Sequence, residues 1–115
     1  MLEVATDNAF EITDHSLKLI DLGITIFKEG WAAVRGDSGA AIAVAVSGAT
    51  SGIFIANLNL KTLGTRNYSQ KNLQKCVILM EQLQAKQQQV FQCVADINAE
   101  AATAVQNDLQ LPLNL

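Results

Sequence analysis

The chain has 115 residues, which is the size of one domain and excludes a multidomain enzyme. Half of its residues are hydrophobic, yet only 5% are aromatic and 17% are charged, a composition that suits closely packed helices better than a β-sandwich. The net charge of −3 disfavours non-specific nucleic-acid binding, because neutralising phosphates requires a surplus of Lys and Arg. We therefore expect one all-α domain of three helices over residues 1–115.

The first predicted helix covers residues 13–36 and follows an N-terminal segment, 1–12, that lacks a sustained hydrophobic period. Thr13 or Asp14 can provide the N-cap. The apolar seam alternates spacings of three and four, as in helices that pack side by side. The seam consists of Leu17, Ile20, Ile24, Phe27, Trp31 and Val34. The alternative is a strand over residues 19–27, where Ile and Thr alternate.

The second predicted helix covers residues 37–64, with Asp37 or Ser38 as its cap and Gly64 just after its end. Its seam has the same alternation and consists of Ile42, Val46, Ala49, Ile53, Ala56, Leu60 and Leu63. Small residues at Gly48, Gly52 and Ala56 repeat every four positions and predict close approach of a partner backbone. The alternative is a β-hairpin with a strand at 41–46.

No charged residue occurs over residues 38–60, a length near the roughly 20 residues that cross a bilayer. This segment is the one transmembrane candidate in the sequence. Polar side chains and glycines interrupt its interior, so burial against protein is favoured over burial in lipid. The polar residues are Ser47, Thr50, Ser51, Asn57 and Asn59, and the glycines are Gly48 and Gly52.

The third predicted helix covers residues 67–111 and is stopped by Pro112. A polar Gln87 within its seam resembles the single polar layer that fixes register in coiled coils. The helix spans about 60 Å, whereas the first two span about 33 and 39 Å, so a hairpin of those two cannot cover it. The uncovered stripe predicts self-association. The seam consists of Leu73, Cys76, Met80, Leu83, Gln87, Val90, Val94, Ile97, Ala101 and Ala104.

Self-association is therefore expected to use residues of the second and third helices. The candidates are Leu73, Met80, Leu83, Val90, Val94, Ile97, Gly48, Gly52 and Ala56.

Charge falls into three blocks that could also guide assembly. Residues 1–37 carry seven acids and three bases, residues 38–80 four bases and no acid, and residues 81–115 four acids and one base. Docking of the basic cluster on an acidic block of another copy is one interpretation, and ordinary solvated faces are the other. The basic cluster consists of Lys61, Arg66, Lys71 and Lys75, and one acidic block contains Glu3, Asp7, Glu11 and Asp14.

Chemistry-bearing motifs are sparse, and we expect neither catalysis nor a cofactor. Gly36-Asp37-Ser38-Gly39 echoes a protease nucleophile loop, but the only histidine, His15, stands at a predicted helix start. One His and two distant Cys cannot build a four-ligand zinc site. Cys76 and Cys93 would lie about 25 Å apart on one helix and cannot bridge within a chain, so both are expected to be small hydrophobes. The absence of a basic, apolar leader favours the cytoplasm.

Three short motifs resemble the Reb structural proteins of bacterial R-bodies. They are Ile12-Thr13-Asp14, Gln87-Gln88-Gln89 and Ala101-Ala102-Thr103. The resemblance implies a cytoplasmic protein that polymerises with copies of itself or close paralogues into coiled ribbons, which extend on acidification. We therefore expect a structural, self-assembling protein. The alternative is a membrane-active pore or translocator protein that inserts residues 38–60.

Overall fold

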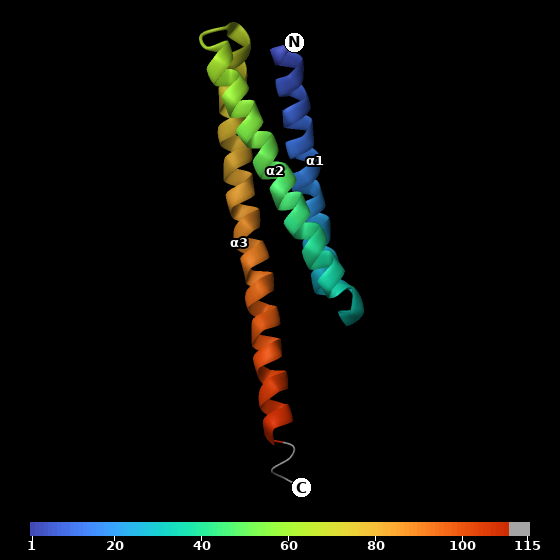
Figure 1. The fold of residues 1–115 in the computed structure, drawn as a ribbon. Helices are drawn as coiled ribbons and strands as arrows, with labels where there is room; N and C mark the ends of the chain where they lie inside the picture. Colours follow the sequence, from blue (N-terminus) through green and yellow to red (C-terminus); the bar gives the residue numbers. More distant parts are fainter. Residues whose placement is uncertain (111–115) are drawn as a thin grey trace.

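The computed structural model describes residues 1–110, which form three long α-helices and one short 3-10 helix (Figure 1). The elements are α1 (Leu2–Glu29), η1 (Ala32–Val34), α2 (Arg35–Leu63) and α3 (Asn67–Gln110). No strand occurs in this part of the chain, so the all-α prediction is confirmed and both strand alternatives are wrong. The predicted stop at Pro112 lies outside the described residues.

The three helices form a rod with dimensions of 74 × 19 × 16 Å. Helices α1 and α2 make an antiparallel hairpin, and α3 runs back along it and continues past its tip (Figure 1). With 28, 29 and 44 residues, α1, α2 and α3 are about 42, 44 and 66 Å long. The predicted mismatch in helix length is therefore present in the fold.

Helix α1 begins at Leu2, which corrects the predicted start at residue 13 and removes the separate segment 1–12. The positions that face the rest of the chain near this end include Thr6 and Thr13, both fully buried. Their hydroxyls donate to the carbonyls of Leu2 and Ala9, four residues earlier, at 2.7 and 2.8 Å. Because each hydroxyl is satisfied within its own helix, threonine serves here as a core residue that a hydrophobic pattern does not detect.

The turn between α1 and α2 lies earlier than predicted. Helix α1 ends at Glu29 rather than residue 36, and α2 begins at Arg35 without a side-chain cap. Ser38 does not cap α2 but lies inside it and donates to the carbonyl of Val34 at 2.9 Å. Trp31 therefore falls in the turn, 83% exposed, and is not part of the seam to which it was assigned.

The end of α2 agrees with the prediction. Gly64 follows Leu63, and its N–H donates to the carbonyl of Leu60 at 3.0 Å. Its φ of 63° is the one positive value among the described residues, a conformation that glycine adopts without steric cost.

Close backbone approach holds α1 against α2. A Cβ at Gly23 would lie 2.5 Å from the Ile42 side chain. A Cβ at Gly52 would clash with Thr13 and lie 2.8 Å from the carbonyl oxygen of Ala9. The predicted seams are buried here, with the exception of the turn residues and the half-buried Val46. The buried seam residues are Leu17, Ile20, Ile24, Phe27, Ile42, Ala49, Ile53, Ala56, Leu60 and Leu63.

Candidate self-association surface

The small-residue stripe of α2 is used within the chain rather than between chains. Gly52 and Ala56 are buried, and a Cβ at Gly48 would lie 2.6 Å from Ser16 Oγ of α1. The partner backbone that the stripe was predicted to meet is therefore α1 of the same molecule. Gly48, Gly52 and Ala56 are accordingly removed from the candidate surface.

Helix α3 contacts the hairpin through one side, which we call the docked face. Its spacing alternates between three and four, and its two cysteines are among its most buried members. Leu79, a buried core residue, was absent from the predicted seam. The docked face consists of Ser69, Asn72, Cys76, Leu79, Leu83, Lys86, Val90, Cys93 and Ile97.

A second stripe is offset by one residue from the docked face and therefore lies about 100° further around α3. We call it the open face. Every member is exposed except Gln87, which is half-buried. Phe91 and Val94 are 70% and 61% exposed. The open face consists of Leu73, Val77, Met80, Gln84, Gln87, Phe91, Val94, Asn98, Ala101 and Val105.

The predicted seam of α3 therefore mixed two stripes. Leu83 and Val90 pack inside the chain, which corrects their assignment to self-association, and Ile97 lies at the edge with 38% exposure. Leu73, Met80 and Val94 do belong to the open face. Because α3 is apolar over a wide arc, spacing alone could not tell which half of the arc meets the hairpin.

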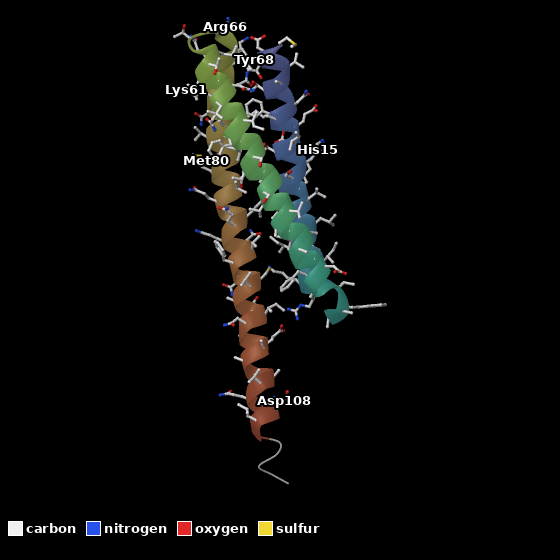
Figure 2. All side chains as sticks on the ribbon, in the orientation of Figure 1. His15, Lys61, Arg66, Tyr68, Met80 and Asp108 are labelled. Carbon is white, nitrogen blue, oxygen red and sulfur yellow. The ribbon has the colours of Figure 1, made fainter. Side chains whose placement is uncertain are left out.

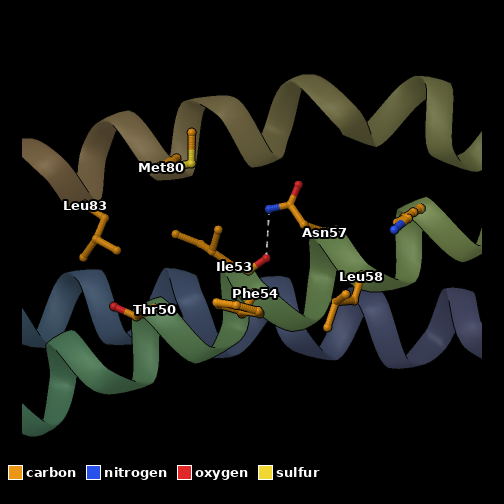
Figure 3. Close-up of a pocket in the computed structure, with 8 residues that line it drawn as sticks. Thr50, Ile53, Phe54, Asn57, Leu58, Met80 and Leu83 are labelled. Carbon is orange, nitrogen blue, oxygen red and sulfur yellow. Dashed lines mark hydrogen bonds between the residues drawn. The ribbon is translucent and has the colours of Figure 1, made fainter.

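Helix α2 extends the open face into an apolar groove of about 400 Å³ between α2 and α3 (Figure 3). Phe54 and Leu58 of α2 are largely exposed there, although neither was singled out in the sequence. The one hydrogen bond drawn in the groove runs from the Asn57 amide to the carbonyl of Ile53, at 3.0 Å. The groove is lined by Thr50, Ile53, Phe54, Asn57, Leu58, Lys61, Met80 and Leu83.

The basic cluster is divided between internal and free positions. Lys75 lies 3.7 Å from Asp14 and 4.7 Å from the centre of the Phe10 ring, so it joins α3 to α1 of its own chain. Within residues 1–110, Lys61, Arg66 and Lys71 form no ion pair and are exposed. Three of the four predicted docking bases are therefore open to another molecule.

Tyr68 connects the start of α3 to the acidic end of α1. Its hydroxyl donates to Asp7 Oδ1 at 2.6 Å and to the carbonyl of Glu3 at 3.2 Å. Burial, together with the hydrogen bond and negative charge of Asp7, raises the pKa of Tyr68 to about 12. Two members of the acidic block are thus engaged inside the chain, one by a base, Lys75, and one by a hydroxyl donor, Tyr68.

Polar contacts also hold α3 against the half of the hairpin that ends in the α1–α2 turn. Arg35 pairs with Glu100 at 2.9 Å and lies 4.6 Å from the centre of the Phe27 ring. Lys86 pairs with Asp21 at 2.5 Å. Neither pair was predicted, since no spacing rule connects residues 65 positions apart.

Both cysteines are buried on the docked face, Cys76 at 3% and Cys93 at 4% exposure, and no disulfide joins them. Burial raises the pKa of the Cys76 thiol, and Lys75 partly offsets this effect. A cross-link between chains would require α3 to leave the hairpin.

The remaining polar motifs form no reactive arrangement in the described residues. His15 lies on the exposed side of α1 rather than at a helix start, while its neighbour Ser16 is buried against α2 (Figure 2). No group of three or more His, Cys, Asp or Glu within residues 1–110 could hold a metal ion.

The segment Ala32–Leu63 is long and apolar enough to cross a membrane by length and composition, with a mean hydropathy of 1.8. A third of its most apolar window is buried inside the fold. The core helix of a soluble protein passes the same test, so this is weak support for a membrane span.

Comparison with known proteins gives no assignment, since no family model, curated protein or solved structure matches the chain.

Proposed function

We propose that this chain is a structural protein that self-assembles through helix packing into an ordered cytoplasmic polymer, an R-body-like ribbon if the resemblance holds. The open face of α3 carries the proposal. It places six large apolar side chains on solvent along one helix, Leu73, Val77, Met80, Phe91, Val94 and Val105. We expect copies of the chain or close paralogues to cover them, without catalysis and without a cofactor.

The length of the open face matters for the energetics. Burying one large apolar side chain contributes about 1.5–3 kcal/mol, whereas association costs about 4–15 kcal/mol before any contact is counted. Several side chains must therefore be buried together. A stripe that runs from Leu73 to Val105 along one helix offers this, whereas scattered exposed residues do not.

Polar residues within the open face can set the register of the copies. Gln84, Gln87 and Asn98 interrupt the apolar positions. A buried amide is costly unless it meets another polar group, so one alignment of two open faces is favoured over its shifted alternatives.

The free bases can make the polymer responsive to pH. Lys61, Arg66 and Lys71 can contact exposed carboxylates such as Glu3 and Glu11 of a neighbouring copy. Acid protonates carboxylates, so these contacts would weaken at low pH while the apolar contacts remained. We expect particle length or turbidity to change on acidification and to depend on salt.

The test is sedimentation velocity with electron microscopy of the purified chain. The parent is expected to form particles far larger than 12.3 kDa. Phe91→Asp with Val94→Asp places charge on the open face and should disperse the particles without changing the circular dichroism spectrum.

A matched control adds the same charge on another side of α3. Ala85→Asp with Gln89→Asp changes two exposed positions away from the open face and should leave the particles intact. A parent that stays monomeric at high concentration would refute the proposal. Particles that survive Phe91→Asp with Val94→Asp would show that the open face is not the interface.

A second candidate is a membrane-active protein that inserts residues 38–60. It is favoured by the hydropathy of α2 and by Val44, Phe54, Ile55 and Leu58, which the hairpin leaves exposed. Flotation with liposomes separates the two candidates. Polymer that stays at the bottom of the gradient supports assembly in water, and protein that rises with the vesicles supports insertion.

A further inference from the structure

Helix α3 leaves the body of the molecule after Glu100, which pairs with Arg35 at the turn between α1 and α2. Residues 101–110, which we call the tail, continue as helix for about 15 Å. Every tail residue from 101 to 109 is exposed, including the apolar Val105 and Leu109. No other helix of residues 1–110 covers this end of α3 (Figure 1).

The α2–α3 groove lies at the opposite end of the rod. On α2 it extends from Thr50 to Lys61, about 17 Å along the helix, which matches the length of the tail. Its lining is almost entirely apolar, and Phe54 and Leu58 stand open to solvent. The tail cannot enter the groove of its own chain, because Met80 and Val105 lie about 37 Å apart on one helix.

Charge is complementary between the tail and the groove. The tail contains Asp108 and no Lys or Arg, whereas the groove is lined by Lys61 and by no acidic residue. Figure 2 shows Lys61 and Arg66 where α2 turns into α3, and Asp108 near the other end of the rod. Two copies placed end to end can therefore bring the apolar tail with Asp108 next to the apolar groove with Lys61.

We infer that the tail of one copy lies in the α2–α3 groove of the next, with Val105 and Leu109 against Phe54, Leu58 and Met80. This inference rests on the proposed function and adds the direction in which the polymer grows. Because tail and groove are different surfaces, each added copy uses one of them in the contact and leaves the other free for the next copy. Such a head-to-tail contact gives a filament, or a ring where the rotation closes, rather than a two-fold symmetric dimer.

The experiment uses two full-length variants that are mixed. The tail variant carries Val105→Asp and Leu109→Asp, and the groove variant carries Phe54→Asp and Leu58→Asp. All four positions are exposed, and circular dichroism checks that each variant keeps its helix content. Cross-linking is read out through one added cysteine in each variant. The tail variant also carries Asn57→Cys in its intact groove, and the groove variant carries Gln106→Cys in its intact tail.

A short bis-maleimide should cross-link this mixture, because one intact tail meets one intact groove. Each variant alone should give no cross-linked dimer. The reverse mixture has the groove variant with Asn57→Cys and the tail variant with Gln106→Cys, and it should give none either. The buried Cys76 and Cys93 serve as an internal background.

The outcomes separate this inference from the proposed function. Equal cross-linking in both mixtures, or none in either, overturns the head-to-tail contact. If the parent nevertheless forms large particles, self-assembly stands and only its direction is wrong. If the parent forms no particles at all, both fall.

Discussion

The two interfaces of this small fold are built on different principles. Between α1 and α2, glycines and hydroxyl residues bring the backbones together, as at Gly52 beside Thr13 and Gly48 beside Ser16. Between the hairpin and α3, larger side chains such as Leu79 and Leu83 fill the space. The first interface uses the apolar seams of both helices, whereas the second uses only half of the apolar arc of α3. The small-residue stripe of α2 is thus used within the hairpin, whereas the open face of α3 remains exposed for another partner.

The largest expected effect breaks the first interface. Gly52→Leu forces a side chain into Thr13 and the backbone of Ala9, so the hairpin must open. Overpacking costs about 1–3 kcal/mol, and we expect about 3 kcal/mol here because backbone atoms cannot rotate away. The measurement is thermal unfolding followed by circular dichroism.

Gly39→Ala is the matched control for that substitution. A Cβ at Gly39 meets nothing within 4 Å, so only helix propensity changes. We expect a gain of up to about 1 kcal/mol. Equal destabilisation by both variants would mean that glycine acts through something other than close approach.

The next effect tests whether α3 can loosen while the hairpin stays folded. Leu79→Ala removes a buried side chain from the docked face and should cost about 2 kcal/mol in urea unfolding. Hydrogen exchange should accelerate in α3 before it does in α1 and α2. The exposed Ile78→Ala should change stability by less than about 0.5 kcal/mol. Uniform acceleration in all three helices would make the fold a single cooperative unit.

A smaller effect concerns the hydrogen bond between Tyr68 and Asp7. Since Tyr68 is the one tyrosine in the chain, ultraviolet absorbance follows its ionisation directly. Its folded pKa of about 12 lies above the ordinary 10.0, so its contribution to stability is complete below about pH 10 and is lost as the pH rises through 12. Asp7→Asn should lower the midpoint towards 10. An unchanged midpoint would assign the shift to burial alone.

The smallest effect belongs to the ion pair between Lys86 and Asp21. Asp21 is more than half exposed, so solvent screens the pair, and Asp21→Asn should cost only about 0.5 kcal/mol. Thermal unfolding at low and high salt is the measurement. A larger loss, insensitive to salt, would give polar contacts a greater share in holding α3 to the hairpin.

The helices themselves were largely predictable, but their contacts were not. Periodicity and Gly64 located the end of α2 and the start of α3. The start of α1 was missed because Thr6 and Thr13 occupy core positions with polar side chains. Local sequence patterns identify apolar helix faces. They do not detect a buried threonine whose hydroxyl is hydrogen-bonded within its own helix.

The candidate surface was half predictable for a related reason. Leu73, Met80 and Val94 were predicted to meet another copy, and they are exposed in the single chain. Leu83 and Val90 were grouped with them because they lie within 100° on the same arc. Only the position of the hairpin decides which side is covered, and that position depends on how closely glycines let α1 and α2 approach. Contacts of this kind join residues far apart in the sequence, and they produce no local spacing pattern from which they could be predicted.

The exposed turn between α1 and α2 also makes the protein its own optical probe. Trp31 is the one tryptophan in the chain. It is exposed to solvent at that turn, which is also the end of the hairpin beyond which α3 continues alone. In the isolated chain, its emission maximum should therefore be red-shifted relative to that of a buried tryptophan, and iodide should quench its fluorescence readily. Any neighbour that reaches this end of the rod would shift the emission to the blue and shield it from quencher, so the growth of an assembly can be followed in real time without a label.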